Sequence, residues 1–202
     1  MIAIADYGMG NRRSVEKALA HVGAESVITA DHDELRAAHA VILPGVGAFP
    51  EAMRNLDRTG LGEVLCERAA AGVPLLGICL GMQLLFQSST EHEGAAGLGL
   101  IPGTVTRLRG PKIPHIGWHD VTFVRASPLT EGLGEAAAFY HVHSFVAWPE
   151  DEAAVVGWGD YGERFASIVQ RGNVMGAQFH PEKSSRDGLA LLRNFVRVGV
   201  PA

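Results

Sequence analysis

Short apolar runs alternate with helical patterns through the N-terminal part of the chain, and this alternation limits its possible folds more than any other feature. The runs are short and rich in β-branched residues, as buried parallel strands are. An order of strand, helix and strand predicts a parallel sheet with helices on both faces. The expected strands cover residues 2–5, 25–29, 40–43 and 73–78, and the expected helices cover residues 15–22, 51–56 and 62–71.

The pattern changes after Gly103 to short alternating stretches, which we interpret as antiparallel additions to the sheet. Helical spacing returns near the C-terminus and predicts a terminal helix over residues 188–198. Since no linker, charge block or repeat divides the chain, we predict one domain over residues 1–202. The added strands are expected at residues 104–108, 121–124, 137–142, 153–158, 166–170 and 174–178.

Composition narrows the functional classes. With 47% hydrophobic and 19% charged residues, the chain can bury a core and is not disordered. A formal net charge of −5 gives no basic surface for nucleic acid. Two cysteines cannot build a secreted disulfide scaffold, the N-terminus has no signal-peptide pattern, and no apolar run reaches the ~20 residues that span a bilayer. We therefore expect a cytoplasmic protein with neither nucleic-acid nor membrane partners.

The stretch Gly77-Ile78-Cys79-Leu80-Gly81-Met82-Gln83 lies between an apolar strand and a helical run at residues 84–86. Glycines two residues before and after a nucleophile permit the sharp strand-to-helix turn of a nucleophile elbow. The turn also places the thiol at a helix N-terminus, which favours thiolate. A buried structural cysteine is the alternative. We prefer it for Cys66, inside an expected helix, and predict Cys79 as the nucleophile.

A thiolate nucleophile requires an imidazole and a third group that orients it. His180 follows the apolar run at residues 174–179, where a strand of the sheet ends. If that strand is a parallel neighbour of the strand before Cys79, His180 lies at the same edge of the sheet as the elbow. Glu182, two residues later, could accept the imidazole N–H. Without a partner cysteine, this segment would be an ordinary loop. Four other histidines are expected at the surface: His21, His32, His39 and His92.

The turn Pro44-Gly45-Val46-Gly47 ends the third expected strand at the carboxyl edge, where open α/β sheets bind ligands. Its glycines allow backbone N–H groups to face an oxyanion, together with the amide of Leu80. The elbow at Cys79, the imidazole of His180 and this turn together predict an acyl-transfer site. Because the glycines also allow the Val46 amide to turn away, we expect the oxyanion hole to be incomplete in the isolated chain and the isolated chain to be a poor catalyst.

The first loop, Gly8-Met9-Gly10-Asn11, partly matches a dinucleotide fingerprint. Arg13 occupies the place of the third glycine, and no acidic ribose partner follows. We therefore expect no nucleotide there. The sequence predicts neither a cofactor nor a metal site.

The motifs at residues 77–83 and 178–183 resemble the two signatures of class I, or triad, glutamine amidotransferases, and the resemblance covers nearly the whole chain. It implies a flavodoxin-like, mostly parallel sheet and hydrolysis of glutamine to glutamate and ammonia through a thioester. By the same resemblance Cys79 is the nucleophile, His180 the general base and acid, and Glu182 its orienter. The implied oxyanion donors are Val46, Gly47 and Leu80, and the implied substrate-binding residues are Gly45, Gln83, Glu91, His143 and Ser144.

Within that family, four segments are similar to the glutaminase subunits of imidazole glycerol phosphate synthase. This implies a heterodimer with a (βα)₈-barrel cyclase subunit, which makes imidazole glycerol phosphate and AICAR in histidine biosynthesis. Trp118 and Lys183 match positions that face the barrel. The chain departs from the family pattern with His119 in place of Asn and Phe145 in place of Tyr. The four segments are residues 44–49, 97–103, 113–118 and 140–144.

Two alternatives remain open. The chain could be the glutaminase subunit of a different synthase, for pyridoxal phosphate, anthranilate or purines. Residues 113–118 and 140–144 carry that distinction. It could instead be a redox-sensing or holdase protein on the same fold, but such relatives usually lack a His-Pro-Glu after the last strand.

Overall fold

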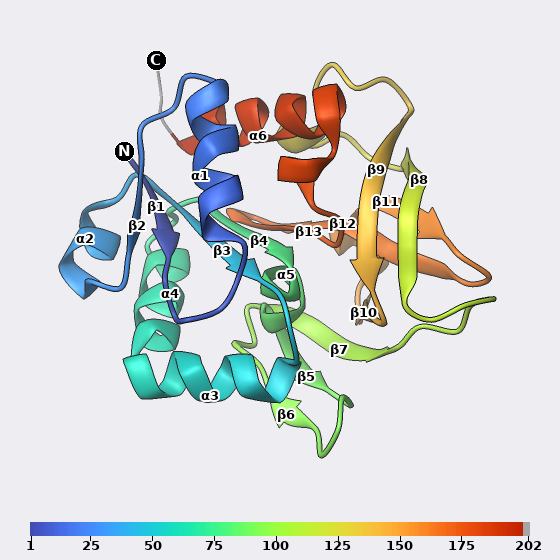
Figure 1. Ribbon diagram of the computed structural model, residues 1–202, viewed down its shortest axis with the longest axis horizontal. Helices are drawn as coiled ribbons and strands as arrows, with labels where there is room; N and C mark the ends of the chain where they lie inside the picture. Colours follow the sequence, from blue (N-terminus) through green and yellow to red (C-terminus); the bar gives the residue numbers. More distant parts are fainter. Residues whose placement is uncertain (200–202) are drawn as a thin grey trace.

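A nine-stranded sheet forms the centre of the computed structural model, which describes residues 1–199 (Figure 1). Five neighbouring strands are parallel: β2 (Ser26–Thr29), β1 (Ile2–Ala5), β3 (Ala40–Gly45), β4 (Leu75–Cys79) and β13 (Val174–Ala177). Four antiparallel strands extend the sheet beyond β13: β12 (Arg164–Arg171), β11 (Val155–Asp160), β8 (His115–Phe123) and β9 (Ala136–His143). This arrangement confirms the expected α/β fold.

Helices cover both faces of the sheet (Figure 1). The strands alternate their side chains between two cores, because Ile2 and Ile4 of β1 pack in one cluster and Ala3 and Ala5 in the other. The first cluster contains residues of α1 (Arg12–His21) and α6 (Ser185–Gly199). The second contains residues of α2 (His32–Ala37), α3 (Phe49–Thr59), α4 (Leu61–Ala70) and α5 (Leu80–Leu84). Within residues 1–199, no helix is both long and apolar enough to cross a bilayer.

A second sheet corrects two of the expectations. It contains β10 (Phe145–Pro149), β7 (Ile101–Arg107), β5 (Phe86–Ser89) and β6 (Ala95–Ala96), in that order. Of the helical run expected over residues 84–86, only Leu84 lies in α5; Leu85 is a turn residue, and Phe86 begins β5 and pairs with Ile101. The strand expected at residues 104–108 lies in this sheet, parallel to β5 and antiparallel to β10, and is not an addition to the main sheet.

The strand expected at residues 174–178 exists as β13, but the expectation that it is one of the antiparallel additions is wrong. β13 lies between β4 and β12, parallel to the first and antiparallel to the second. All four of its residues are buried, as in a strand covered on both faces. Three short 3₁₀ helices complete the described elements: η1 (Pro128–Thr130), η2 (Glu152–Ala154) and η3 (Pro181–Lys183).

Strand register brings the ends of three strands together at one edge of the sheet. Gly45 of β3 pairs with Cys79 of β4, and Ala177 of β13 pairs with Ile78 of β4. The segments that follow these strands therefore start side by side. They contain the turn at residues 44–47, the elbow at Cys79 and the segment at residues 178–182.

Candidate active site

Cys79 ends β4 and immediately precedes α5 in a backbone conformation that L-residues rarely adopt, with φ 55° and ψ −112°. Such strain persists only where the surroundings impose it. A Cβ at Gly81 would overlap the main-chain oxygen of Leu43, and one at Gly77 would lie 2.6 Å from the oxygen of Gly81. Glycine is therefore required on both sides of the elbow. The thiol is 6% exposed and lines a pocket of about 300 Å³.

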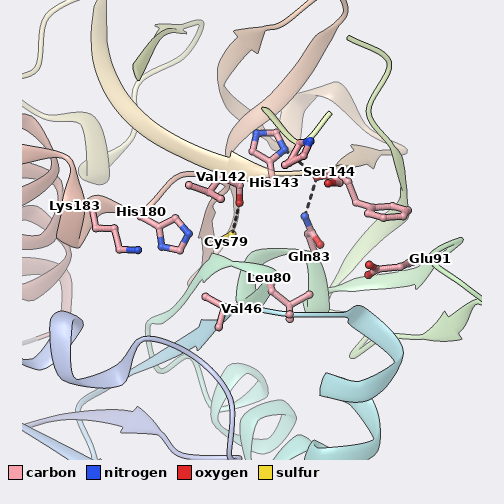
Figure 2. A pocket seen from close by; sticks show the side chains of 13 residues that line it. Val46, Cys79, Leu80, Gln83, Glu91, Val142, His143, Ser144, His180 and Lys183 are labelled. Carbon is pink, nitrogen blue, oxygen red and sulfur yellow. Dashed lines mark hydrogen bonds between the residues drawn. The ribbon is translucent and has the colours of Figure 1, made fainter. Parts of the chain in front are cut away.

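His180 lies beside Cys79 on the wall of this pocket (Figure 2). Its Nδ1 donates to Oε1 of Glu182 at 2.9 Å, and Asn11 Nδ2 donates to the same oxygen at 3.4 Å. Burial lowers the pKa of His180, but hydrogen bonds and charge from Cys79 and Glu182 outweigh burial and raise it to about 10. The arrangement therefore favours an imidazolium next to the sulfur.

The turn after β3 lines the same pocket with Val46 and Gly47. Figure 2 shows Val46 across the pocket from Val142, His143 and Ser144. Val46 is 42% exposed, and Gly47 has φ 105°, a conformation that favours glycine. Leu80 contributes a further part of the lining. Gly45 is buried behind this turn and is not part of the pocket lining. A Cβ there would lie 2.6 Å from the amide nitrogen of Gly81, so the turn and the elbow are in close contact at this residue.

Gln83, Glu91 and Ser144 also line the pocket, as Figure 2 shows. Nε2 of Gln83 donates to the main-chain oxygen of Phe145 at 2.9 Å and to Oε1 of Gln178 at 3.0 Å. Both amide hydrogens are thus used inside the protein, which leaves Oε1 as an acceptor. One carboxylate oxygen of Glu91 accepts from the amide of Phe49 at 2.7 Å.

His143 lines the pocket, but its ring is occupied by other protein groups. Nδ1 lies 3.1 Å from the main-chain oxygen of Phe145, which can only accept, so Nδ1 carries the hydrogen. Neutral His143 therefore accepts at Nε2, and the donor is Nδ1 of His115 at 3.1 Å. Any contact of His143 with a ligand is consequently left to its main chain.

A cluster of histidines behind this wall was missed by the sequence analysis. His115 stacks on His141 and on Tyr161, with ring centroids 5.0 and 4.0 Å apart, and His119 meets it edge-on at 4.4 Å. Burial, then neighbouring imidazoles, lowers the pKa of His115 to about 4 and that of His143 to about 3, and that of His141 also lies well below its usual range. The three buried rings are thus neutral at ordinary pH.

Trp118 and Lys183 are both exposed. Trp118 lies on β8 with a side chain 51% exposed and its ring 6.1 Å from that of Tyr140, and Ile116 on the same strand is 57% exposed. Lys183 lines the pocket. Two exposed apolar side chains, Ile116 and Trp118, thus follow Pro114, which itself lines the pocket.

The remaining predicted residues lie away from the pocket. Cys66 is half-buried on α4, its Sγ 3.8 Å from the oxygen of Leu98, and burial raises the pKa of its thiol. His21, His39 and His92 are exposed, whereas His32 is half-buried and its Nε2 lies 2.8 Å from the oxygen of Thr59. Among the side chains of residues 1–199, no group of three or more His, Cys, Asp or Glu could hold a metal ion.

Known proteins similar to this chain agree in family. The sequence model described as "Glutamine amidotransferase class-I" matches residues 3–198. Subunit HisH of imidazole glycerol phosphate synthase from Moorella thermoacetica is 54% identical over 195 residues, covering 96% of this chain and 93% of the relative. The same subunit from Bacillus cereus strain G9842 is 53% identical over 196 residues, with the same coverage. A structure of PurLQS from Thermotoga maritima has a TM-score of 0.78 at 21% identity, covering 98% of this chain and 97% of the other, and shows the fold alone.

Proposed function

The chain belongs to the class I glutamine amidotransferase family, and on that premise we propose that Cys79, His180 and Glu182 carry out its glutaminase reaction. It is an enzyme, the glutaminase subunit of imidazole glycerol phosphate synthase in histidine biosynthesis. Relatives at about 50% identity over 96% of the chain favour this assignment over other synthases and over a sensor or holdase. The observation that carries the residue roles is the 2.9 Å bond from His180 to Glu182 in the pocket that Cys79 lines.

The reaction begins with attack of the Cys79 thiolate on the side-chain amide of glutamine. The oxyanion that forms is stabilised by the amide of Leu80 and by the turn at Val46 and Gly47. His180, as the imidazolium, protonates the nitrogen, and ammonia leaves as the thioester forms. His180 then takes a proton from water, the resulting hydroxide cleaves the thioester, and glutamate leaves while thiolate and imidazolium are restored. Glu182 holds the ring in orientation throughout.

Gln83 and Glu91 bind the α-ammonium end of glutamine. The free Oε1 of Gln83 is an acceptor, and the Glu91 carboxylate adds negative charge on the same side of the pocket. The main chain at His143 and Ser144 forms the opposite wall. Gly45 supports the turn from behind.

A partner cyclase subunit receives the ammonia. This partner is a (βα)₈ barrel that docks as a heterodimer on the exposed surface containing Trp118 and Lys183. That surface is apolar at Ile116 and Trp118 and adjoins the pocket lining, which supports the assignment. The chain forms one domain over residues 1–202 and works in the cytoplasm.

The test of these roles uses the chain assembled with its cyclase partner. Cys79→Ala should abolish product formation from glutamine and leave formation from added ammonium salts intact, because the second reaction occurs in the partner. Cys66→Ala is the matched control and should retain both activities. An electrophilic glutamine analogue should label Cys79 and spare Cys66. Loss of the ammonium-driven reaction in an assembled Cys79→Ala complex would contradict the proposal.

Partner control is tested by measuring glutamine turnover for the chain alone, with the partner, and with partner plus a substrate analogue. Each oxyanion donor that is absent at rest costs roughly 10² to 10³ in kcat. We expect the fastest turnover in the third condition. Equal kcat in all three would exclude control through the turn at Val46 and Gly47.

A further inference from the structure

Gln178 is a fully buried polar side chain that joins Gln83 to Cys79. It follows β13 directly, and its exposed fraction is 0%. Its Oε1 accepts from Nε2 of Gln83 at 3.0 Å, and its Nε2 lies 3.9 Å from Sγ of Cys79. The backbone amide of Gln178 donates to the oxygen of Ser167 at 2.8 Å, which fixes the main chain at this point.

The direction of these hydrogen bonds follows from one main-chain carbonyl. The oxygen of Phe145 can only accept, so the amide group of Gln83 must turn its nitrogen toward it. The second hydrogen of that nitrogen then points to Gln178, which must present its oxygen. Reversing the Gln178 amide would set two N–H donors against each other. The nitrogen of Gln178 consequently faces the sulfur.

We propose that Gln178 is a positioning residue that holds the Gln83 amide with its oxygen toward the substrate and directs an N–H to the sulfur of Cys79. This inference rests on the glutaminase function proposed above. The Gln178 side chain would thus have two effects that can be measured separately. One concerns binding of glutamine through Gln83, and the other concerns the negative charge on Cys79.

The sulfur has neighbours with opposite preferences. The main-chain oxygen of Val142, 3.7 Å away, accepts from the protonated thiol, whereas the N–H of Gln178 favours the thiolate. Thiolate is required both for attack on glutamine and as the group that leaves when water cleaves the thioester. Gln178 therefore assists both chemical steps.

The ionisable groups that surround Cys79 in the parent protein are retained in every variant at position 178, and Gln178→Glu adds one carboxyl to them. His180 lies next to the sulfur, and Glu182 lies on the far side of the imidazole. The buried Tyr7 is close enough for the charge of Cys79 to raise its pKa. His143, Glu91 and Lys183 line the pocket that the thiol faces. Differences among variants at position 178 are therefore differences in the side chain at that position.

Two substitutions separate the two effects. Gln178→Met fills the same volume without any polar group, so Gln83 loses one acceptor and Cys79 loses the N–H. Gln178→Glu keeps an oxygen toward Gln83 but, once ionised, presents a second oxygen to the sulfur. Gln170→Met is the matched control, because Gln170 lies on the neighbouring strand β12 and its amide bonds to Ser127 and Gly172, outside the pocket.

Four quantities are measured on the assembled complex: kcat for glutamine, KM for glutamine, the rate of Cys79 alkylation by iodoacetamide, and the unfolding midpoint. Each is followed from about pH 6 to about pH 9, so that the carboxyl of Gln178→Glu is ionised at the upper end. For Gln178→Met we expect a raised KM together with roughly tenfold losses in kcat and alkylation rate. For ionised Gln178→Glu we expect similar losses in kcat and alkylation rate with KM within about twofold of the parent.

Unchanged alkylation rates in both variants, or equal losses in Gln170→Met, would overturn the proposal. A lowered unfolding midpoint with parental kcat, KM and alkylation rate would show a structural role only and would also overturn it. The alkylation measurement does not require glutamine turnover. A parent complex that fails to hydrolyse glutamine would thus contradict the proposed function, while the alkylation rates would still decide the role of Gln178.

Discussion

Tyr7 donates its phenolic hydrogen to the main-chain oxygen of Pro44 at 2.9 Å, inside the protein and directly behind the turn that faces the pocket. The ring is fully buried, and a Cβ on Gly45 would lie 2.9 Å from its hydroxyl. Burial, followed by the charge of Cys79, raises the pKa of Tyr7 above its ordinary value, so the hydroxyl remains a donor. The turn is fixed at Pro44 and Gly45, and its exposed part begins at Val46.

Tyr7→Phe should therefore lower stability and turnover together. The substitution keeps the ring and removes one buried hydrogen bond, which should lower the free energy of unfolding by about 1 kcal/mol. Glutamine turnover of the complex should fall because the base of the turn is less fixed. Urea unfolding and steady-state kinetics measure the two effects. Tyr140→Phe, on a half-buried ring near Trp118, is the control for stability, and parental values for Tyr7→Phe in both measurements would contradict the argument.

The raised pKa of His180 predicts a loss of stability in alkaline solution. The native protein holds this proton up to about pH 10, whereas the unfolded chain releases it near 6.5. The contribution of His180 is complete below 6.5 and decreases as pH rises toward 10. The difference in unfolding free energy between the parent and His180→Asn should shrink over that interval. A difference that stays constant with pH would show that His180 has no such linkage.

The buried histidine cluster predicts the opposite dependence in acid. Its rings stay neutral in the native protein to about pH 4 at His115 and about pH 3 at His143, while unfolded imidazoles take up protons near 6.5. The free energy of unfolding should therefore fall as pH drops below 6.5, by about 1.4 kcal/mol per pH unit for each ring.

His141→Phe tests this acid dependence, because His141 already packs against the rings of Phe165 and Phe179. The unfolding free energy of His141→Phe should decline less steeply with falling pH than that of the parent. The difference should be about 1.4 kcal/mol per pH unit, the contribution of one imidazole. The exposed His21 supplies the control, and His21→Gln should keep the parental slope. Identical slopes in all three proteins would disprove a neutral buried cluster.

Two glycine substitutions should have opposite effects on stability. Gly81→Ala forces a methyl group into the main chain of Leu43 next to the elbow, so the protein should lose more than about 4 kcal/mol or fail to fold. Gly62→Ala in α4 places its methyl in ordinary contact with Leu98, 3.4 Å away, and should gain up to about 1 kcal/mol. Chemical denaturation of both variants decides the matter, and a stable, soluble Gly81→Ala protein would refute the steric argument.

The hydrophobic pattern of the sequence predicted those helices and strands whose pattern fits only one kind of element. The strand at residues 2–5 and the terminal helix were both predicted, the helix extending to Ser185–Gly199 in the structure. The strand that begins at Phe86 was not predicted, because an apolar residue after two leucines fits either a helix or a strand. Its pairing with Ile101, which makes it a strand residue, cannot be seen in the local sequence. α2 was missed because it is short and polar, although Asp31 accepts from the amides of Asp33 and Glu34 and Glu34 follows at capping-box spacing.

The candidate site could be anticipated where chemistry depends on neighbours in sequence. Cys79 between two glycines and His180 two residues before Glu182 are local signals, and the structure brings these three residues together. The histidine cluster could not be anticipated, since His115 and His143 are 28 residues apart and meet only through the pairing of β8 with β9. The polarity of the Gln83 and Gln178 amides likewise depends on a carbonyl of a distant strand.

The register that pairs Gly45 with Cys79 also determines where the chain tolerates changes in length. A single residue inserted into β3 or β4 would shift the turn relative to the thiol by about 3.3 Å and send each following side chain to the opposite face. Loops at the other ends of these strands, such as residues 71–74, can lengthen without changing that pairing. Insertions and deletions among related enzymes, and those made in the laboratory, should therefore accumulate at the amino edge of the parallel sheet.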